Sequence, residues 1–391
     1  MSAGSHAPAP RIASVDLLRG LVMIVMALDH SRDFFLSLPY PPEDLTQASP
    51  ALFFTRWITH FCAPVFVFLA GVSAWLYARN TRATPAQLSR FLWTRALWLF
   101  FIEIAVFSAS WRFSFDWTVL QVIWAIGCSL LLLSIVCRFS WRVSVVLGLA
   151  IVLGHNLLDP LEPADFGRFA LLWNLLHVPR FDFAIGDHPV WILYPVLPWM
   201  GVLLLGYAWG AVLTRDVTPA GVSWQRLSIS IGGAAIVLFA LLRGFNLYGD
   251  PDPWQVQPRG ALFSFLDVLN TTKYPPSLAF LLMTLGPALV LMPLLEHWRG
   301  KLAQIVSVFG RVPFFFYVLH FPLIHALYRV RAHVSLGGPW DVFFRPPPAA
   351  YEPSLARAYL VWAFVVFVLY WPCRWFADLK RRRRDWWLSY L

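Results

Sequence analysis

Apolar runs of membrane-spanning length recur along almost the whole chain, and no other feature constrains its fold as strongly. A helix needs about 20 predominantly apolar residues to cross the hydrocarbon core of a bilayer. Only 13% of the residues are charged, against roughly 25% in soluble domains. We therefore predict an all-α, polytopic membrane helical bundle with about ten transmembrane helices. Their approximate bounds are 17–36, 53–78, 91–110, 118–137, 142–158, 190–213, 227–246, 275–295, 304–327 and 356–377.

The distribution of Lys and Arg among the loops predicts the orientation of these spans. In a ten-span bundle the most basic loops and the tail LKRRRRD share one face, and cytoplasmic loops carry the excess of Lys and Arg. Both termini are therefore predicted to be cytoplasmic. Residues 36–50, 159–189, 247–274 and 328–355 then face outward. We expect a disordered leader at 1–10, a transmembrane domain at 11–379 and a basic cytoplasmic tail at 380–391.

The net charge and the cysteines bear on nucleic acid binding and on disulfide or metal sites, and we expect none of these. The net charge of +10 is explained by loop asymmetry and by attraction to the lipid bilayer, so no nucleic acid partner is expected. The four cysteines lie in apolar segments without metal-ligand spacing. We interpret Cys62, Cys128, Cys137 and Cys373 as small buried hydrophobes, and expect neither a disulfide nor a metal site.

Polar residues interrupt several spans at one predicted level of the membrane. Such residues are rare in spans and usually face a cavity or a partner. The outer ends of the predicted spans hold Asp29, His30, His60, Lys273, Tyr274, His320 and His325. Structural alternatives exist, because Lys273 can snorkel, Tyr274 can join an aromatic belt and His60 can meet lipid headgroups. His320 and His325 are about 140° apart around a helix, so one of them can be structural.

The first span carries a cation and an imidazole on one face. Arg19 and His30 are eleven residues apart, which is about 16 Å along a helix. A cation at the predicted cytoplasmic end and a deeper imidazole would therefore line the same groove. Arg19 can alternatively be only a positive-inside anchor.

The first span also resembles the first-helix signature of membrane acyltransferases. The stretch SVDLLRGLVMIVMALDH contains an Arg, ten residues and a His, as in the acyltransferase-3 family. Three further stretches are similar to bacterial relatives of heparan-alpha-glucosaminide N-acetyltransferase: FFTRWITHFCAPVFVFLAGVSAWL, LNTTKYPPSLAFLLMTLGPAL and GRVPFFFYVLHFPLIHAL. The resemblance implies a multi-pass protein of the bacterial inner (cytoplasmic) membrane. Its activity would be transfer of an acyl group, usually acetyl from acetyl-CoA, to an extracytoplasmic sugar or glycan.

The resemblance further implies catalytic residues. The first-helix motif of the family corresponds here to Asp16, Arg19, Gly20, Asp29 and His30. The lysosomal enzyme has Asn at the position of Asp29 and its active-site His in the first luminal loop, whereas this chain has no His between 31 and 59. We therefore assign the catalytic base to His30, following the acyltransferase-3 pattern.

Acyl transfer assigns roles to the remaining polar residues, since it needs a base for the acceptor and a donor for the oxyanion. We predict that Asp29 or Asp33 orients His30, and we assign Asp29 as the catalytic carboxylate because it is deeper and adjacent to the base. Substrate contacts are predicted for Asp33, His60, Lys273, Tyr274, His320 and His325. Guanidinium forks suit phosphates, and CoA binding is predicted for Arg19, Arg79, Arg82, Arg90 and Arg95.

A proton-coupled solute transporter is the main alternative, because ionisable residues and Pro-broken helices in spans also suit that function. The sequence shows no internal two-fold repeat, which speaks against it. A non-catalytic membrane scaffold would leave the outer histidines without a role. The sequence leaves open the acceptor, N- versus O-acylation, the acyl length, an acyl-His intermediate and the oligomeric state, a homodimer being one option.

Overall fold

The computed structural model describes residues 12–214, 221–338, 348, 351–383 and 385–389. The predicted leader and part of the predicted tail lie outside them. The α-helices are α1 (Ala13–Phe35), α2 (Pro50–Thr59), α3 (Cys62–Thr81), α4 (Pro85–Ile102), α5 (Ala109–Arg112), α6 (Val122–Val136), α7 (Trp141–Gly154), α8 (Ala170–Leu176), α9 (Leu197–Leu213), α10 (Trp224–Gly244), α11 (Ala261–Leu269), α12 (Leu278–Glu296), α13 (Lys301–Arg311), α14 (Pro313–Leu336) and α15 (Leu355–Arg382). The shorter π and 3₁₀ segments are η1 (Glu103–Ser108), η2 (His155–Leu158), η3 (Pro163–Phe169) and η4 (Trp386–Ser389). The strands are β1 (Thr118–Leu120), β2 (Arg180–Ile185) and β3 (His188–Ile192).

Within the described residues, six helical segments are long and apolar enough to cross a membrane, or seven if one bent pair counts as a span. The six are Pro50–Thr81, Pro85–Arg112, Trp141–Leu158, Trp224–Gly244, Leu278–Glu296 and Leu355–Arg382. Helices α6 and α9 are apolar but shorter, with 15 and 17 residues. Helix α1 is continuous, but its apolar sequence is interrupted by five charged residues: Asp16, Arg19, Asp29, Arg32 and Asp33. Ten spans and the cytoplasmic placement of both termini therefore stay predictions.

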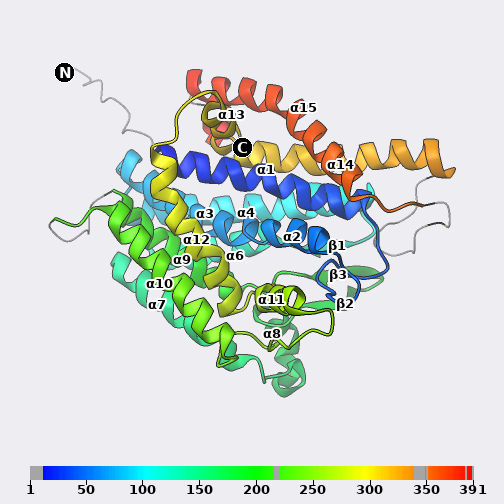
Figure 1. Cartoon of the computed structure of the whole chain (residues 1–391). Helices are drawn as coiled ribbons and strands as arrows, with labels where there is room; N and C mark the ends of the chain where they lie inside the picture. Colours follow the sequence, from blue (N-terminus) through cyan, green and yellow to red (C-terminus); the bar gives the residue numbers. More distant parts are fainter. Residues whose placement is uncertain (1–11, 215–220, 339–347, 349–350, 384, 390–391) are drawn as a thin grey trace, which may run out of the picture.

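The ninth predicted span, at 304–327, is sharply bent, and whether it crosses the membrane as one span stays a prediction. The chain there forms α13 and α14, which meet at an angle of 87°. Pro313 begins α14, and the residue before a proline avoids helical geometry, so Val312 has φ −132° and ψ 50°. Helix α13 packs closely on α1, where a Cβ at Gly310 would lie 1.7 Å from the carbonyl oxygen of Asp16. After the break, α14 runs beside α1 (Figure 1).

The prediction of an all-α chain is wrong in one region, because a small sheet lies among the helices. Strand β1 pairs in parallel with β3, and β2 pairs antiparallel with β3, so the order is β1-β3-β2. Gly186 and Asp187 form the turn between β2 and β3, and Gly186 has a φ of 61°, a conformation that favours glycine. The runs predicted to span from 118 and 190 therefore begin as strands.

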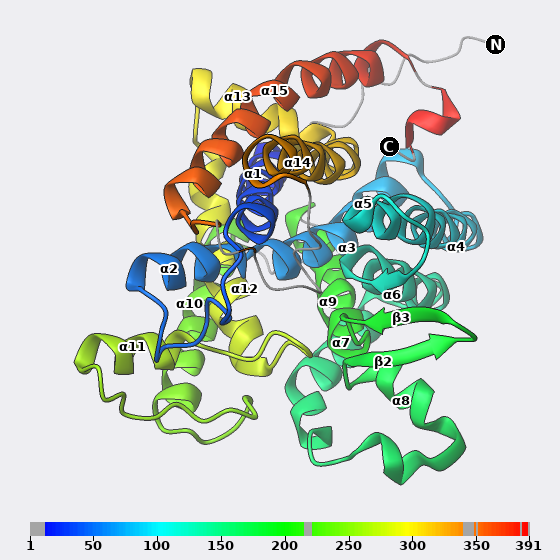
Figure 2. The same cartoon turned by 90° about the vertical axis from the view of Figure 1, so that its right-hand side faces the viewer.

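Helix α1 is central to the bundle. It contacts α2, α3, α12, α13, α14 and α15, and Figure 2 shows α1 and α14 nearly end-on. Elsewhere in the bundle α9 packs on α7, and α10 packs on α12. Contacts of α9 with α3 join these helices to the ones around α1. The sheet lies at the end of the bundle toward which α1 runs (Figure 1). The last turns of α1 therefore meet strands and loops, not only other helices.

Candidate active site

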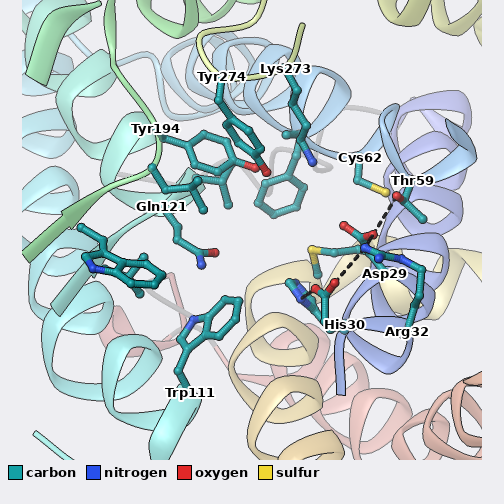
Figure 3. A pocket seen from close by; sticks show the side chains of 18 of the residues that line it. Asp29, His30, Arg32, Thr59, Cys62, Trp111, Gln121, Tyr194, Lys273 and Tyr274 are labelled. Atoms are coloured by element: carbon teal, nitrogen blue, oxygen red, sulfur yellow. Dashed lines mark hydrogen bonds and ion pairs between the residues drawn. The ribbon is translucent and has the colours of Figure 1, made fainter. Parts of the chain in front are cut away.

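The last turns of α1 border a cavity of about 280 Å³. Helices α2 and α3, the sheet and the segment before α12 complete its walls (Figure 3). Five of the predicted site residues line this cavity: Asp29, His30, Asp33, Lys273 and Tyr274. Sequence reasoning missed the polar residues Arg32, Arg56, Thr59, Gln121 and Tyr194. Arg56 had a usable signal, because it is an ionisable residue inside an apolar run, as Asp29 is.

The imidazole of His30 faces Asp33 and not the adjacent Asp29. Nδ1 of His30 lies 3.5 Å from Oδ2 of Asp33, one helical turn further along α1. The ring packs edge-on against Phe321 with centroids 4.8 Å apart, and the ring of His320 is 5.3 Å away. A carboxylate beside one ring nitrogen and aromatic neighbours around the ring hold the orientation of a histidine that acts as a base.

Asp29 is the centre of a hydrogen-bonded ion network. Its carboxylate accepts hydrogen bonds from Arg56 at 2.8 and 3.0 Å, from Arg32 at 2.8 Å and from Thr59 at 2.9 Å. Arg32 also donates to Asp33 at 2.7 Å. Buried charges persist when they are paired and hydrogen-bonded in this way. Asp29 therefore fastens the end of α1 to α2, which carries Arg56 and Thr59.

Glu43, in the loop between α1 and α2, extends this network to His60. Nε of Arg56 donates to Oε1 of Glu43 at 2.6 Å, and Nε2 of His60 lies 3.8 Å from the same oxygen. Burial alone would raise the pKa of Glu43, but the charge of Arg56 and the contact with His60 outweigh it and hold the pKa far below its usual range. His60 does not line the cavity; its ring packs 5.4 Å from that of Phe280. His60 therefore joins the network at Glu43 and lies outside the cavity lining.

Lys273 and Tyr274 enter the cavity from the segment before α12. Nζ of Lys273 lies 5.1 Å from the ring centroid of Tyr274, which packs edge-on against Tyr194 at 5.2 Å. Gln121 reaches into the same space from the residue before α6 (Figure 3). The wall opposite His30 thus presents an ammonium, an amide and phenols to a ligand.

Side chains from distant segments hold this loop in place. Asp250 accepts hydrogen bonds from the backbone of Thr272 at 3.1 Å and from the hydroxyl of Ser277 at 2.8 Å. Burial raises the pKa of Asp250. Nε2 of His155 lies 2.9 Å from the carbonyl oxygen of Pro276. Lys273 and Tyr274 are therefore positioned by a braced loop, which explains their defined orientation outside a helix.

The two histidines of α14 have different surroundings, and neither lines the cavity. His320 is fully buried beside His30, and its Nδ1 lies 2.7 Å from the carbonyl oxygen of Tyr317. The ring of His325 is stacked between those of Phe34 and Phe113, and its Nδ1 donates to a backbone carbonyl at 2.7 Å. His320 supports His30 from behind, whereas His325 is a packing residue, because the helical turn between them points them apart.

A second, basic cavity of about 290 Å³ lies further back along α1. Arg19 lines it and donates to the hydroxyl of Ser73 at 2.7 Å and to the carbonyl oxygen of Gly310 at 3.2 Å. Arg95 lines it too. Arg311 and Lys380, which sequence reasoning did not assign, complete its basic lining. We name this space the basic cavity and the first one the His30 cavity.

Three arginines predicted to bind CoA lie elsewhere. Arg79 lines a separate pocket with Tyr207 and Cys137. Arg82 follows the last turn of α3 and is exposed, and Arg90 is exposed on α4. The sequence groups them in one basic segment between two predicted spans, but none of the three lines the basic cavity.

The same helices line both cavities. Helix α1 contributes Arg19 to the basic cavity and His30 to the other, and α14 contributes Phe314 and Tyr317 respectively. Phe66 of α3 lines both. The two spaces therefore adjoin along the bundle axis. Among the residues that the structure describes, no group of three or more His, Cys, Asp or Glu is placed to hold a metal ion.

Comparison with known protein families shows the family to which the chain belongs. The model described as "Heparan-alpha-glucosaminide N-acetyltransferase, catalytic" matches residues 11–240, more than half of the chain. The chain belongs to this family. Membership makes it a membrane-bound acetyltransferase, and acetyl-CoA is the donor that the family uses. Comparison with curated proteins gives no match. The family match includes Arg19, His30 and Arg56, and ends before Lys273 and Tyr274.

Proposed function

We propose that the chain moves an acetyl group from cytoplasmic acetyl-CoA to an amino or hydroxyl group of a sugar on the opposite side of the bacterial inner membrane. One observation carries the proposal: the basic cavity and the His30 cavity adjoin along α1 and α3 and share Phe66. Arg19 and His30 are eleven residues apart on α1, or about 16 Å. A donor bound by its phosphates at Arg19 can thus extend its thioester toward His30.

The lining of the basic cavity suits coenzyme A. Guanidinium groups bind phosphate oxygens in pairs, and Arg19 and Arg95 provide them beside the ammonium of Lys380. Tyr77 and Phe91 line the same cavity and stack with ring centroids 3.8 Å apart. Their aromatic surface suits a planar base such as adenine.

The His30 cavity has the groups that acyl transfer needs. The acceptor nitrogen or oxygen attacks the thioester carbonyl while His30 takes its proton through the ring nitrogen that does not face Asp33. Lys273, Tyr274 and Gln121 are the donors available to the tetrahedral oxyanion. The intermediate then expels the CoA thiolate, which takes the proton back from His30, so the enzyme returns to its starting state.

Transfer across sealed vesicles tests the proposal. Oriented vesicles receive labelled acetyl-CoA on the face with the basic cavity and a glucosamine-terminated oligosaccharide on the other. We expect label on the sugar, and a rate about 10²–10⁴-fold lower for His30→Ala with CoA binding retained. His333→Ala, at an exposed histidine of α14, is the matched control. Label that appears only when both substrates share one compartment would refute transmembrane transfer, and sugar that crosses unacetylated would support the transporter.

A further inference from the structure

One face of α3 lines both cavities, and the size of its side chains changes along that face. The cavity-lining residues of α3 are, in order, Cys62, Ala63, Phe66, Leu69, Ala70, Ser73, Ala74 and Tyr77. Ala63 lines the His30 cavity, whereas Ala70 and Ser73 line the basic cavity. Phe66 lines both cavities, so its ring lies where the two meet, with the small residues Ala63 and Ala70 on either side along the helix.

Tyr317 of α14 faces Phe66 at this junction. Their rings are nearly parallel, with centroids 6.4 Å apart and an interplanar angle of 19°. Phe107 stacks against Tyr317 at 4.9 Å and 18°. Tyr317 is only 1% exposed, whereas Phe66 is partly buried. Tyr317 is therefore fixed by packing, whereas part of the Phe66 ring is open to the two cavities.

The hydroxyl of Tyr317 adds a polar group to this aromatic junction. It is buried and has no hydrogen-bond partner among the described residues. An unpaired buried hydroxyl costs free energy, so native structures usually provide a partner. A donor of this kind beside a cavity is suited to a carbonyl oxygen of a ligand that passes it.

We propose that Phe66 and Tyr317 form a gate that selects the acyl donor, an inference that rests on the proposed function. The ring of Phe66 restricts the acyl group that enters the His30 cavity to the size of acetyl. The hydroxyl of Tyr317 donates a hydrogen bond to a carbonyl oxygen of the pantetheine arm. No covalent bond changes at the gate, which acts by size and by one hydrogen bond.

Acyl-chain length tests the role of Phe66. Purified enzyme is assayed with acetyl-, butyryl- and hexanoyl-CoA under the same acceptor concentration. We expect Phe66→Ala to raise the butyryl-to-acetyl ratio of kcat/KM by about tenfold or more, since extra methylenes discriminate by about this amount in a filled pocket. Phe66→Leu is a milder change that should raise the ratio less and keep the fold. Phe68→Ala is the matched control, because Phe68 lies on α3, packs near Trp209 and lines neither cavity.

Steady-state kinetics test the role of Tyr317. Tyr317→Phe should raise the KM for acetyl-CoA roughly 3- to 10-fold, as expected for one lost hydrogen bond, and leave the acceptor KM unchanged. Tyr370→Phe on α15, which lines neither cavity, should change neither constant. Unchanged length ratios in both Phe66 variants, with active wild-type enzyme, would overturn the gate alone. Wild-type enzyme that transfers nothing from acetyl-CoA would instead overturn the proposed function.

Discussion

The two carboxylates near the end of α1 have different partners, so neutralising each should have a different effect. Asp29→Asn keeps the shape of the side chain but removes the charge between Arg32 and Arg56. Breaking a buried ion pair costs about 3–5 kcal/mol. Arg32 retains Asp33 and Arg56 retains Glu43, so we expect the lower end, about 3 kcal/mol. For a chain of 391 residues this corresponds to a fall in Tm of roughly 4 °C.

Asp33→Asn should act mainly on catalysis. It removes the carboxylate 3.5 Å from the His30 imidazole, while Arg32 keeps its bond to Asp29. Because the base then loses its charged partner, we expect kcat to fall about 10²-fold, within the range for general-base catalysis. Thermal unfolding of the purified variants reports stability, and release of CoA thiol reports kcat. A larger loss of kcat in Asp29→Asn than in Asp33→Asn, at unchanged Tm, would refute this reasoning and make Asp29 the orienting carboxylate.

Three further predictions follow from the same contacts. The depressed pKa of Glu43 contributes stability that is fully present above about pH 4.5 and is lost progressively below it. The fall in Tm between pH 6 and pH 3 should therefore be smaller in Glu43→Gln than in the wild type. Combined Arg19→Ala and Arg95→Ala should raise the KM for acetyl-CoA at least about tenfold, whereas Arg90→Ala, at an exposed position, should leave it unchanged. Gly310→Ala would place a Cβ 1.7 Å from a carbonyl oxygen of α1, so we expect a large loss of folded protein in size-exclusion chromatography.

Local periodicity explains which parts of the site were predictable from the sequence. Arg19, Asp29 and His30 belong to one helix, whose fixed rise and turn set their spacing without reference to any other segment. The resemblance found in that helix and its neighbours led to the acetyltransferase family, and the match over residues 11–240 confirms it. Apolar runs likewise located helices such as α12, predicted at 275–295 and observed at Leu278–Glu296.

Contacts between distant segments determined the parts of the site and of the fold that the sequence did not predict. Asp33 faces His30 while Arg56, from another helix, engages Asp29. Arg311 and Lys380 reach the basic cavity from the far end of the chain. The sheet pairs β1 with β3, although α6, α7 and α8 lie between them in the sequence. The hydropathy of a span indicates that it is buried, but it leaves open the rotation of the helix and the identity of its neighbours. The sequence alone therefore determined the family and the central helix, whereas side-chain packing determined which charges meet in each cavity.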